Sequence, residues 1–177
     1  GVSVNFDLSI SSNSTGGVYI GGAVGYAEET TISSIRVGHY SYSSNRRVNI
    51  SVDLNNCTTN NFIGGLLGRG ADTQVSSCDA LTNINVKGAE GASDGTVTRM
   101  NIIGGLIGQY ALSGESSINI NTSNTESYIT IGDSEDNMST VINNLFVSTG
   151  VGYVYSNIAT VEIKQCVFIG EIDTVSY

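Results

Sequence analysis

Asn61-Phe62-Ile63-Gly64-Gly65-Leu66-Leu67-Gly68 is the stretch of sequence that decides the fold. It returns at residues 18–25 as VYIGGAVG and at residues 101–108 as NIIGGLIG, and a worn copy, FVSTGVG, lies at residues 146–152. The last glycines of the four copies are separated by 43, 40 and 44 residues: Gly25, Gly68, Gly108 and Gly152. A fixed period of this length is typical of solenoids, whose stacked repeats bury a continuous core. The period therefore predicts a solenoid.

The glycines of these blocks are predicted to serve the backbone. Glycine can adopt positive φ and lets one backbone approach another closely, so it marks bends and crowded corners. A phosphate-binding loop is the alternative, but that loop needs a following helix and, for nucleotides, a lysine and a serine or threonine at set positions. The block has none of these. The predicted structural glycines are Gly21, Gly22, Gly25, Gly64, Gly65, Gly68, Gly104, Gly105, Gly108 and Gly152.

Alternating apolar and polar residues follow each block. Residues 48–54, VNISVDL, show the pattern best, and residues 84–86, 128–131 and 168–172 carry weaker versions. Alternation with a period of two is typical of half-buried strands, so each repeat is predicted to hold three short strands. Ten residues after the last glycine, three repeats place a side chain that we expect in one interior ladder: Ile35, Cys78 and Ile118.

The glycine block, followed by Val75-Ser76-Ser77-Cys78, resembles the GLUG-motif repeat family, which is named for its Gly-Leu-hydrophobic-Gly core. Family members typically follow that core with a phrase like Ile-Ser-Asn-Cys. The resemblance covers roughly residues 18–166, and it departs from the family pattern at Ala23, at Ile118 and in the worn fourth copy. It implies a right-handed parallel β-helix or a close relative, within a large surface or secreted protein of a microbe.

One all-β domain is therefore predicted, a parallel β-helix or β-solenoid of about four repeats of about 40 residues. The absence of proline agrees, because proline cannot donate to a strand ladder. Residues 1–17 are expected to be the back half of a preceding coil, since residues 2–10 alternate in the phase of residues 48–54. The predicted repeats are residues 18–60, 61–100, 101–145 and 146–177.

The composition excludes several classes of partner. The chain of 177 residues has a net charge of −9, from 7 basic and 16 acidic side chains. Binding to nucleic acid or to an anionic membrane surface depends on basic side chains, so neither partner is expected. No apolar run of 18 residues occurs, and membrane insertion is not expected either.

Catalysis finds few candidate residues. His39 is the only histidine, and it lies beside Tyr40 and Tyr42 in an insertion between strands. Some parallel β-helices are polysaccharide lyases or hydrolases, but those enzymes need carboxylates or bases clustered on one sheet face. Here the acidic residues are scattered, so we predict a non-enzymatic protein without catalytic residues or a bound cofactor. The tyrosines of this insertion could stack on sugar rings, although an ordinary exposed loop is the favoured interpretation.

The three cysteines, Cys57, Cys78 and Cys166, leave two alternatives open. Cys78 stands where other repeats place isoleucine, which indicates a small buried side chain. A Cys57–Cys78 disulfide forms instead if the two residues face each other on adjacent coils. No Cys-x-x-Cys motif and no second histidine occur, so no transition-metal site is expected.

Two further features concern ions and modification. Asp133, Glu135 and Asp136 offer the oxygen ligands that Ca²⁺ prefers, but their spacing departs from the EF-hand pattern and a solvated acidic loop is favoured. Asn-x-Ser/Thr sequons occur five times. Three of them are predicted to lie in loops and are the candidate glycosylation sites: Asn13, Asn121 and Asn137.

Two classes of function remain. The first is a structural or adhesive solenoid, extracellular or at the cell surface, that forms a stalk or a head-to-tail fibre. Its partners would be further copies, adjoining repeats of a longer chain, or surface glycans. The second is a carbohydrate-binding or polysaccharide-processing β-helix. Aromatic and acidic side chains gathered on one face would favour the second class, and a uniform exterior of serine and threonine would favour the first.

Overall fold

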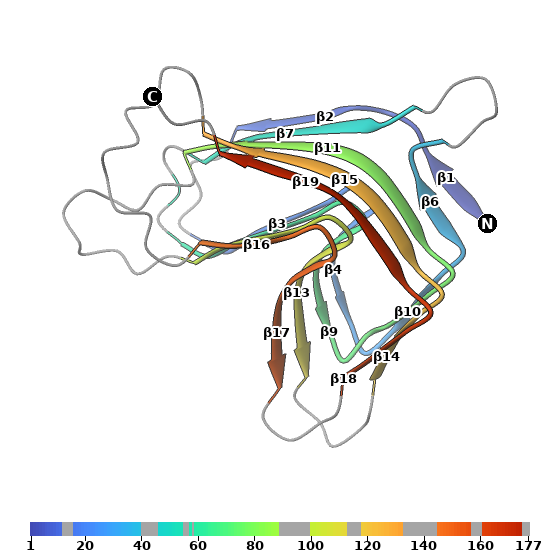
Figure 1. The fold of residues 1–177 in the computed structure, drawn as a ribbon. Helices are drawn as coiled ribbons and strands as arrows, with labels where there is room; N and C mark the ends of the chain where they lie inside the picture. Colours follow the sequence, from blue (N-terminus) through green and yellow to red (C-terminus); the bar gives the residue numbers. More distant parts are fainter. Residues whose placement is uncertain are drawn as a thin grey trace.

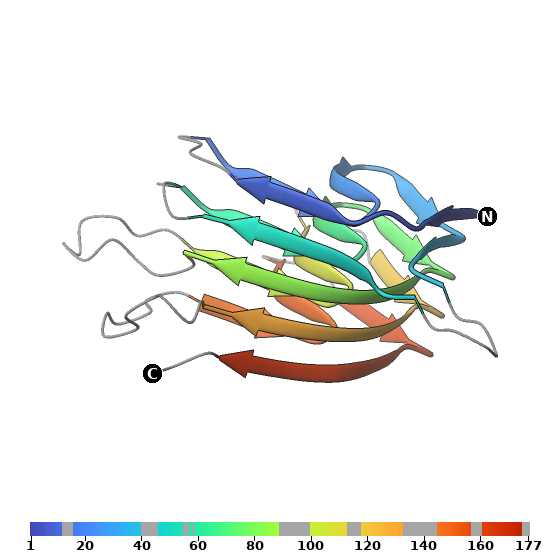
Figure 2. The same ribbon diagram turned by 90° about the horizontal axis from the view of Figure 1, so that it is seen from above.

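The predicted solenoid is confirmed by a computed structural model, which describes residues 1–11, 16–39, 46–54, 57, 59–88, 100–112, 118–132, 145–156 and 161–174. Every pairing between its named strands is parallel, and none of the described residues is helical. Figure 1 looks down the stack, so that equivalent strands overlap. Figure 2, turned by 90°, shows the long strands lying one above another.

Each coil contributes one strand to each of three four-stranded sheets. The first sheet consists of β3 (Val18–Gly21), β8 (Asn61–Gly64), β12 (Asn101–Gly104) and β16 (Leu145–Ser148). The second consists of β4 (Val24–Glu28), β9 (Leu67–Ala71), β13 (Ile107–Leu112) and β17 (Val151–Ser156). The third consists of β5 (Thr31–Ser33), β10 (Gln74–Ser76), β14 (Ile118–Asn121) and β18 (Val161–Lys164).

The fourth sheet has seven strands and closes the coil. Its long members are β11 (Asp79–Lys87), β15 (Asn124–Ile131) and β19 (Val167–Thr174). Earlier in the chain the same path is split into β1 (Val2–Val4) and β2 (Leu8–Ser11), and then into β6 (Ile35–Val37) and β7 (Val48–Asp53). Because β1 pairs with β6 and β2 with β7, residues 1–11 occupy the position expected of the back half of a coil.

The prediction of three strands per repeat was wrong, because each complete coil passes through four sheets. The later coils have four strands, and the first has five because its path through the fourth sheet is split into β6 and β7. The glycine block is itself two strands, such as β8 and β9, joined at Gly65-Leu66. Short strands on both sides of a glycine pair cannot be separated by apolar periodicity alone, since nearly every residue of the block is buried.

The interior is built from equivalent positions of successive coils. Leu66 and Leu106 are both fully buried and bonded through their backbones, Leu66 N donating to Leu106 O at 2.9 Å. Leu106 N donates in turn to Gly150 O at 2.8 Å, so glycine takes the leucine position in the last coil. A Cβ on Gly150 would lie 2.4 Å from the ring of Phe168. Phe168 therefore fills the space that leucine occupies in the preceding coils.

The expected ladder of Ile35, Cys78 and Ile118 is correct for its first two members and wrong for the third. Asp79 is in register with Arg36 and with Asn124, so the residue opposite Cys78 in the third coil is Ser123. Ser123 Oγ accepts a hydrogen bond from Cys78 N at 3.2 Å. Ile118 lies opposite Val161 in the third sheet instead.

An insertion explains this shift. Ala71 is in register with Ala111, and Val75 is in register with Ile120. Val75 therefore follows Ala71 by four residues, whereas Ile120 follows Ala111 by nine. For this reason a count of ten residues from Gly108 reaches Ile118, five residues before Ser123.

Crowding, rather than positive φ, explains the glycines of the blocks. The left-handed glycines of the described residues are Gly38, Gly88, Gly132 and Gly170, and none belongs to a block. A Cβ on Gly65 would instead lie 2.0 Å from the carbonyl oxygen of Gly105 in the next coil, far inside van der Waals contact. The expected close approach of backbones is therefore correct, and the expected left-handed bend is not.

Candidate functional site

The outward side chains of the first and second sheets form a concave face of the molecule. In the first sheet Val18 and Ile20 point into the core, whereas Tyr19 between them is 38% exposed. Its counterparts in the next coils are Phe62, Ile102 and Phe146. Across the corner, the equivalent outward residues of the second sheet are Tyr26, Arg69, Gln109 and Tyr153.

The corner between these sheets is made by the last glycine of each block. A Cβ on Gly68 would lie 2.7 Å from the backbone nitrogen of Ile20, and one on Gly108 would lie 2.7 Å from the carbonyl oxygen of Ile63. The second sheet can therefore begin directly against the backbone of the first, and the two sheets diverge from that point (Figure 1). The angle between them opens outward, so side chains from both sheets meet above the glycines.

Each coil places one pair of side chains across this corner. In the first coil the rings of Tyr19 and Tyr26 have centroids 5.4 Å apart, and in the last coil the rings of Phe146 and Tyr153 are 5.0 Å apart. Tyr19 also stacks on Phe62 of the next coil, with centroids 5.2 Å apart and an interplanar angle of 10°. The rings thus form two aromatic clusters, one over the first two coils and one on the last coil, with Ile102 and Gln109 between them.

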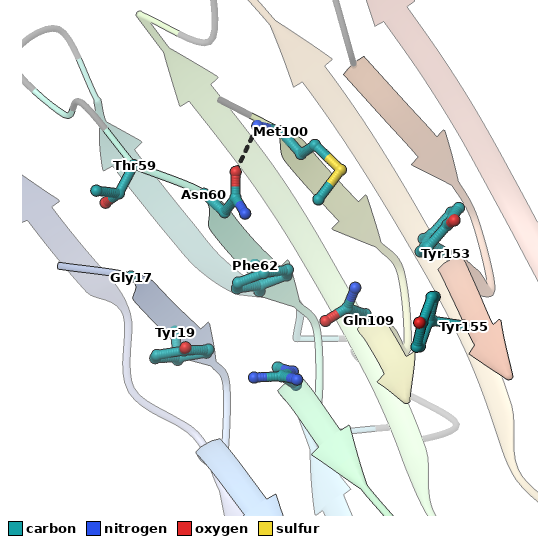
Figure 3. A pocket seen from close by; sticks show the side chains of 10 residues that line it. Gly17, Tyr19, Thr59, Asn60, Phe62, Met100, Gln109, Tyr153 and Tyr155 are labelled. Atoms are coloured by element: carbon teal, nitrogen blue, oxygen red, sulfur yellow. Dashed lines mark hydrogen bonds between the residues drawn. The ribbon is translucent and has the colours of Figure 1, made fainter. Parts of the chain in front are cut away.

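A groove of about 500 Å³ lies over this corner, and we call it the aromatic groove. Figure 3 shows Tyr19 and Phe62 on one side, Gln109 near the middle, and Tyr153 and Tyr155 on the other side. Its wall consists of Gly17, Tyr19, Thr59, Asn60, Phe62, Arg69, Met100, Gln109, Tyr153 and Tyr155.

Polar groups are interspersed among these rings. Asn60 Oδ1 accepts a hydrogen bond from Met100 N at 2.8 Å, which fixes the orientation of the amide (Figure 3). Gln109 brings a second amide, and the tyrosines bring hydroxyl groups. Arg69 is the one charged side chain among the wall residues that the structure describes, and none of these residues is a carboxylate. At the rim, burial raises the pKa of Tyr26, and a hydrogen bond with Glu28 raises it further.

The composition of the described wall suits binding. Its described residues include no pair of carboxylates, no histidine and no nucleophile beside a base. Apolar rings with a few oriented polar groups are typical of sites that bind small or chain-like organic ligands. Elsewhere in the described part of the chain, no group of three or more His, Cys, Asp or Glu side chains is placed to hold a metal ion.

Those candidate residues from the sequence that the structure describes do not form a site. His39 is exposed and exchanges backbone hydrogen bonds of 2.9 Å with Arg46, while Tyr40 and Tyr42 lie outside the described residues. The proposed calcium ligands Asp133, Glu135 and Asp136 also lie outside them. All three cysteines are thiols: Cys57 and Cys78 are buried and not joined to each other, and Cys166 is half-buried.

Of the candidate glycosylation sites, Asn13 and Asn137 lie outside the described residues. Asn121 was expected in a loop, but it is the last residue of β14 and its side chain is half-buried. Its Oδ1 accepts a hydrogen bond from Thr122 Oγ1 at 3.1 Å. The expected loop position was wrong because the insertion in the third coil precedes β14 and does not follow it.

The groove residues were missed although a simple signal marks them. Five of them belong to two positions of the repeat, the sixth residue before the last glycine of the block and the residue directly after that glycine. These positions hold Tyr19 and Tyr26, Phe62 and Arg69, Ile102 and Gln109, and Phe146 and Tyr153. These positions vary while the rest of the block repeats. A varied position within a repeat faces solvent or a ligand, and this variation was the available sign.

No protein-family model, curated protein or solved structure matches this chain. The resemblance to GLUG-motif repeats consequently stays a prediction from the motif. Among the described residues there is no helix long and apolar enough to cross a membrane.

Proposed function

We propose that the chain is a non-enzymatic adhesive module of an extracellular or cell-surface repeat protein, and that it binds carbohydrate chains in the aromatic groove. The solenoid acts as the rigid support, and the groove is the binding surface. The observation that carries the proposal is the aromatic surface itself, in which Tyr19, Phe62, Tyr153 and Tyr155 line one groove together with amide and hydroxyl groups.

Sugar rings fit this combination of groups. The C–H faces of a pyranose ring are apolar and pack against aromatic rings, while its hydroxyl groups point outward and need hydrogen-bond partners. Asn60, Gln109 and Thr59 provide such partners beside the rings of the wall. Successive coils repeat about every 4.8 Å, close to the length of one sugar ring, so a linear chain can follow the solenoid axis from coil to coil.

The charge of the protein supports carbohydrate over nucleic acid as the ligand. Bases also stack on aromatic rings, but their affinity depends on basic side chains along the phosphate backbone. The described wall of the groove contributes one cation, and the chain as a whole has a net charge of −9. Binding of sugar rings rests on packing against aromatic rings and on hydrogen bonds, and it does not need a row of basic side chains.

Affinity electrophoresis in gels that contain soluble polysaccharides tests the proposal. We expect gels with some neutral or acidic polysaccharides to retard the wild-type chain, and the combined variant Tyr19→Ala, Tyr153→Ala and Tyr155→Ala to migrate as in empty gels. Tyr128→Ala is the matched control, because Tyr128 is a 41% exposed tyrosine of the fourth sheet, outside the groove. Failure of a broad panel to retard the wild type would refute carbohydrate binding.

A stalk or fibre made by stacking coils is a second function, favoured by the exposed last coil. Val167, Ile169 and Ile172 of β19 are 52%, 58% and 42% exposed, and strand edges of this kind template further pairing. We propose that an adjoining coil, from a longer chain or from another copy, covers this edge. A head-to-tail contact whose rotation does not close propagates as a filament.

Thr149 gives this second proposal a specific test. In the preceding coils the equivalent glycines lie directly under the next coil, since a Cβ on Gly105 would be 2.1 Å from Thr149 O. Thr149→Gly should therefore promote end-to-end association, and Ile169→Lys should oppose it. Light scattering over a range of protein concentrations measures both effects. A wild-type chain that stays monomeric at high concentration, with Thr149→Gly behaving identically, would count against stacking.

A further inference from the structure

Arg69 is the unusual residue of the aromatic groove. It lies in the middle of the second sheet, in register with Tyr26 of the preceding coil and Gln109 of the next. Its guanidinium carbon lies 5.6 Å from the ring centroid of Tyr26 and 5.6 Å from that of Phe62. Two aromatic rings therefore hold the cation in place, and this arrangement preserves its charge while limiting its freedom.

The hydrogen-bonding capacity of Arg69 is not used within the described part of the protein. Its Nε is buried and has no hydrogen-bond partner, and no described carboxylate forms an ion pair with it. Two other arginines, Arg36 and Arg47, differ in this respect. Arg36 pairs with Asp79 at 3.2 Å, and Arg47 pairs with Glu126 while its guanidinium lies over Tyr128. Buried polar atoms normally have partners, so the orphaned Nε marks Arg69 as a side chain whose hydrogen bonds are not completed by the described residues.

The surroundings of Arg69 favour an anionic partner. Among the described residues that line the groove there is no carboxylate, although acidic residues outnumber basic ones 16 to 7 in the chain. The guanidinium presents its donors in a planar fork that matches carboxylate and sulfate oxygens. Gln109, 7% exposed and on the adjacent rung, adds an amide about 4.8 Å further along the groove.

We propose that the groove selects an acidic polysaccharide and that Arg69 binds its carboxylate or sulfate group. This inference rests on the proposed carbohydrate binding and adds the ligand's charge to it. The aromatic rings pack against the faces of the sugar rings, and Arg69 binds one anionic substituent on one sugar. The single cation of the described wall is enough to recognise one sugar anion, whereas binding of a phosphate backbone depends on many basic contacts.

The experiment compares ligands that differ only in charge. Polygalacturonate and its highly methyl-esterified form share one backbone, and esterification removes the negative charge. Calorimetric titration of the full chain should show polygalacturonate binding about tenfold or more tightly than the ester, despite the net negative charge of the protein. Dextran sulfate against dextran is the second pair, and it distinguishes a sulfate-selective groove from a carboxylate-selective one.

Arg69→Gln is the decisive variant and Arg36→Gln its matched control. We expect Arg69→Gln to bind the acid and the ester with affinities within about twofold of each other, with binding of the ester retained. Retained ester binding shows that the rings are still in place. Arg69→Lys, which keeps the charge without the planar fork, should recover part of the preference. Arg36→Gln should keep all of it.

The possible results separate the two proposals. Equal wild-type affinities for acid and ester, or an unchanged preference in Arg69→Gln, would overturn the role of Arg69 and leave carbohydrate binding intact. No binding to either member of both ligand pairs would overturn the acidic-ligand proposal directly, and failure of the wider gel panel would then remove carbohydrate binding as well.

Discussion

The inner and outer sides of the glycine corner are made from the same eight-residue block, yet they follow different rules. Inside, the coils repeat nearly the same residue at each rung: Ile20, Ile63, Ile103 and Val147 in the first sheet, and Val24, Leu67, Ile107 and Val151 in the second. Outside, one rung reads Tyr26, Arg69, Gln109 and Tyr153, four positions with little chemistry in common apart from the two tyrosines.

The difference follows from packing. Adjacent coils are separated by one strand spacing, so an interior side chain must fit directly against its counterpart, and a change of size in one coil requires compensation nearby. Gly150 and Phe168 are such a compensation. An outward side chain faces a groove and is not constrained in this way. The repeat can therefore hold its core constant and vary its binding surface.

Replacing the glycine at the contact between coils should have the largest effect on the free energy of unfolding. Gly65→Ala places a Cβ 2.0 Å from Gly105 O, and because a backbone carbonyl has to move, we expect a loss of about 4 kcal/mol or more in the free energy of unfolding. Gly70→Ala is the matched control, since its Cβ would meet only side chains, the nearest being Leu67 at 3.0 Å. Ala27 already occupies the equivalent position in the first coil.

Gly70→Ala should consequently cost about 1 kcal/mol or less. Urea denaturation followed by circular dichroism measures both variants. Equal losses for Gly65→Ala and Gly70→Ala would show that the tight coil contact at Gly65 is not a determinant of stability.

Truncation of an interior leucine should give the next largest effect. Leu66→Ala removes a fully buried side chain and should cost about 2–5 kcal/mol. Tyr19→Ala, on the outward side of the same corner, removes a larger side chain that is 38% exposed and should cost about 1 kcal/mol or less, chiefly the lost stacking on Phe62. A costlier Tyr19→Ala would show that the groove is part of the core.

Removing one member of the buried asparagine pair should have an intermediate effect on the free energy of unfolding, and replacing both members by apolar residues should restore most of the loss. Asn61 Nδ2 donates to Asn101 Oδ1 at 2.7 Å between two coils, and both side chains are fully buried. Asn61→Ala deprives Asn101 of this donor and should cost about 1–3 kcal/mol.

The double variant Asn61→Val and Asn101→Leu should regain most of that loss. The neighbouring coils already carry Val18 and Leu145 at the same rung, so apolar residues fit there. The same denaturation measurement applies, and a double variant less stable than Asn61→Ala would show that the amides are needed for the fold.

The sequence predicted the interior well because the interior repeats. The period of the glycine blocks placed all four coils, and the alternation of residues 2–10 matched β2 to β7. It did not show that β1 pairs with β6. The ladder beyond Cys78 could not be placed, because a fixed count from Gly108 does not register the longer connection in the third coil. Hydrogen bonding between strands sets register, and loop length does not reveal it.

The groove could not be predicted from the sequence, because its residues do not repeat from coil to coil. Its residues are distributed over four coils, and only the stacking of those coils brings Tyr19, Phe62, Arg69, Gln109 and Tyr153 onto one face. The sequence shows that these positions vary within the repeat. It does not show that the corner glycines turn the two sheets into a concave surface, since that depends on backbone contacts between residues such as Gly68 and Ile20.

Removing a carboxylate from the exposed polar ladder of the fourth sheet should have the smallest effect on stability. Asp7 accepts hydrogen bonds from Asn49 N at 2.9 Å and from Asn49 Nδ2 at 3.2 Å, and the backbone bond is the main cause that lowers the pKa of Asp7 below 3.8. A lowered folded-state pKa stabilises the fold above the ordinary carboxyl pKa, and this contribution is lost as the pH falls through the lowered value.

Asp7→Ala should therefore have a slightly lower Tm than the wild type at pH 6, and the difference should disappear in acid, below the lowered pKa. Thermal melts at pH values from neutral to strongly acidic measure the difference. A gap that stays constant, or widens on acidification, would contradict the assigned hydrogen bonds.

The most direct test of the aromatic groove as the binding surface is to map a bound oligosaccharide on the protein. We suggest titrating ¹⁵N-labelled protein with oligogalacturonate and following the backbone amide resonances. Binding in the groove predicts shifts at Tyr19, Phe62, Arg69, Gln109 and Tyr153, with little change along β11 and β15 of the fourth sheet. Shifts centred on the fourth sheet, or no shifts with this or any other polysaccharide of the panel, would contradict the assignment of the groove as the carbohydrate-binding site.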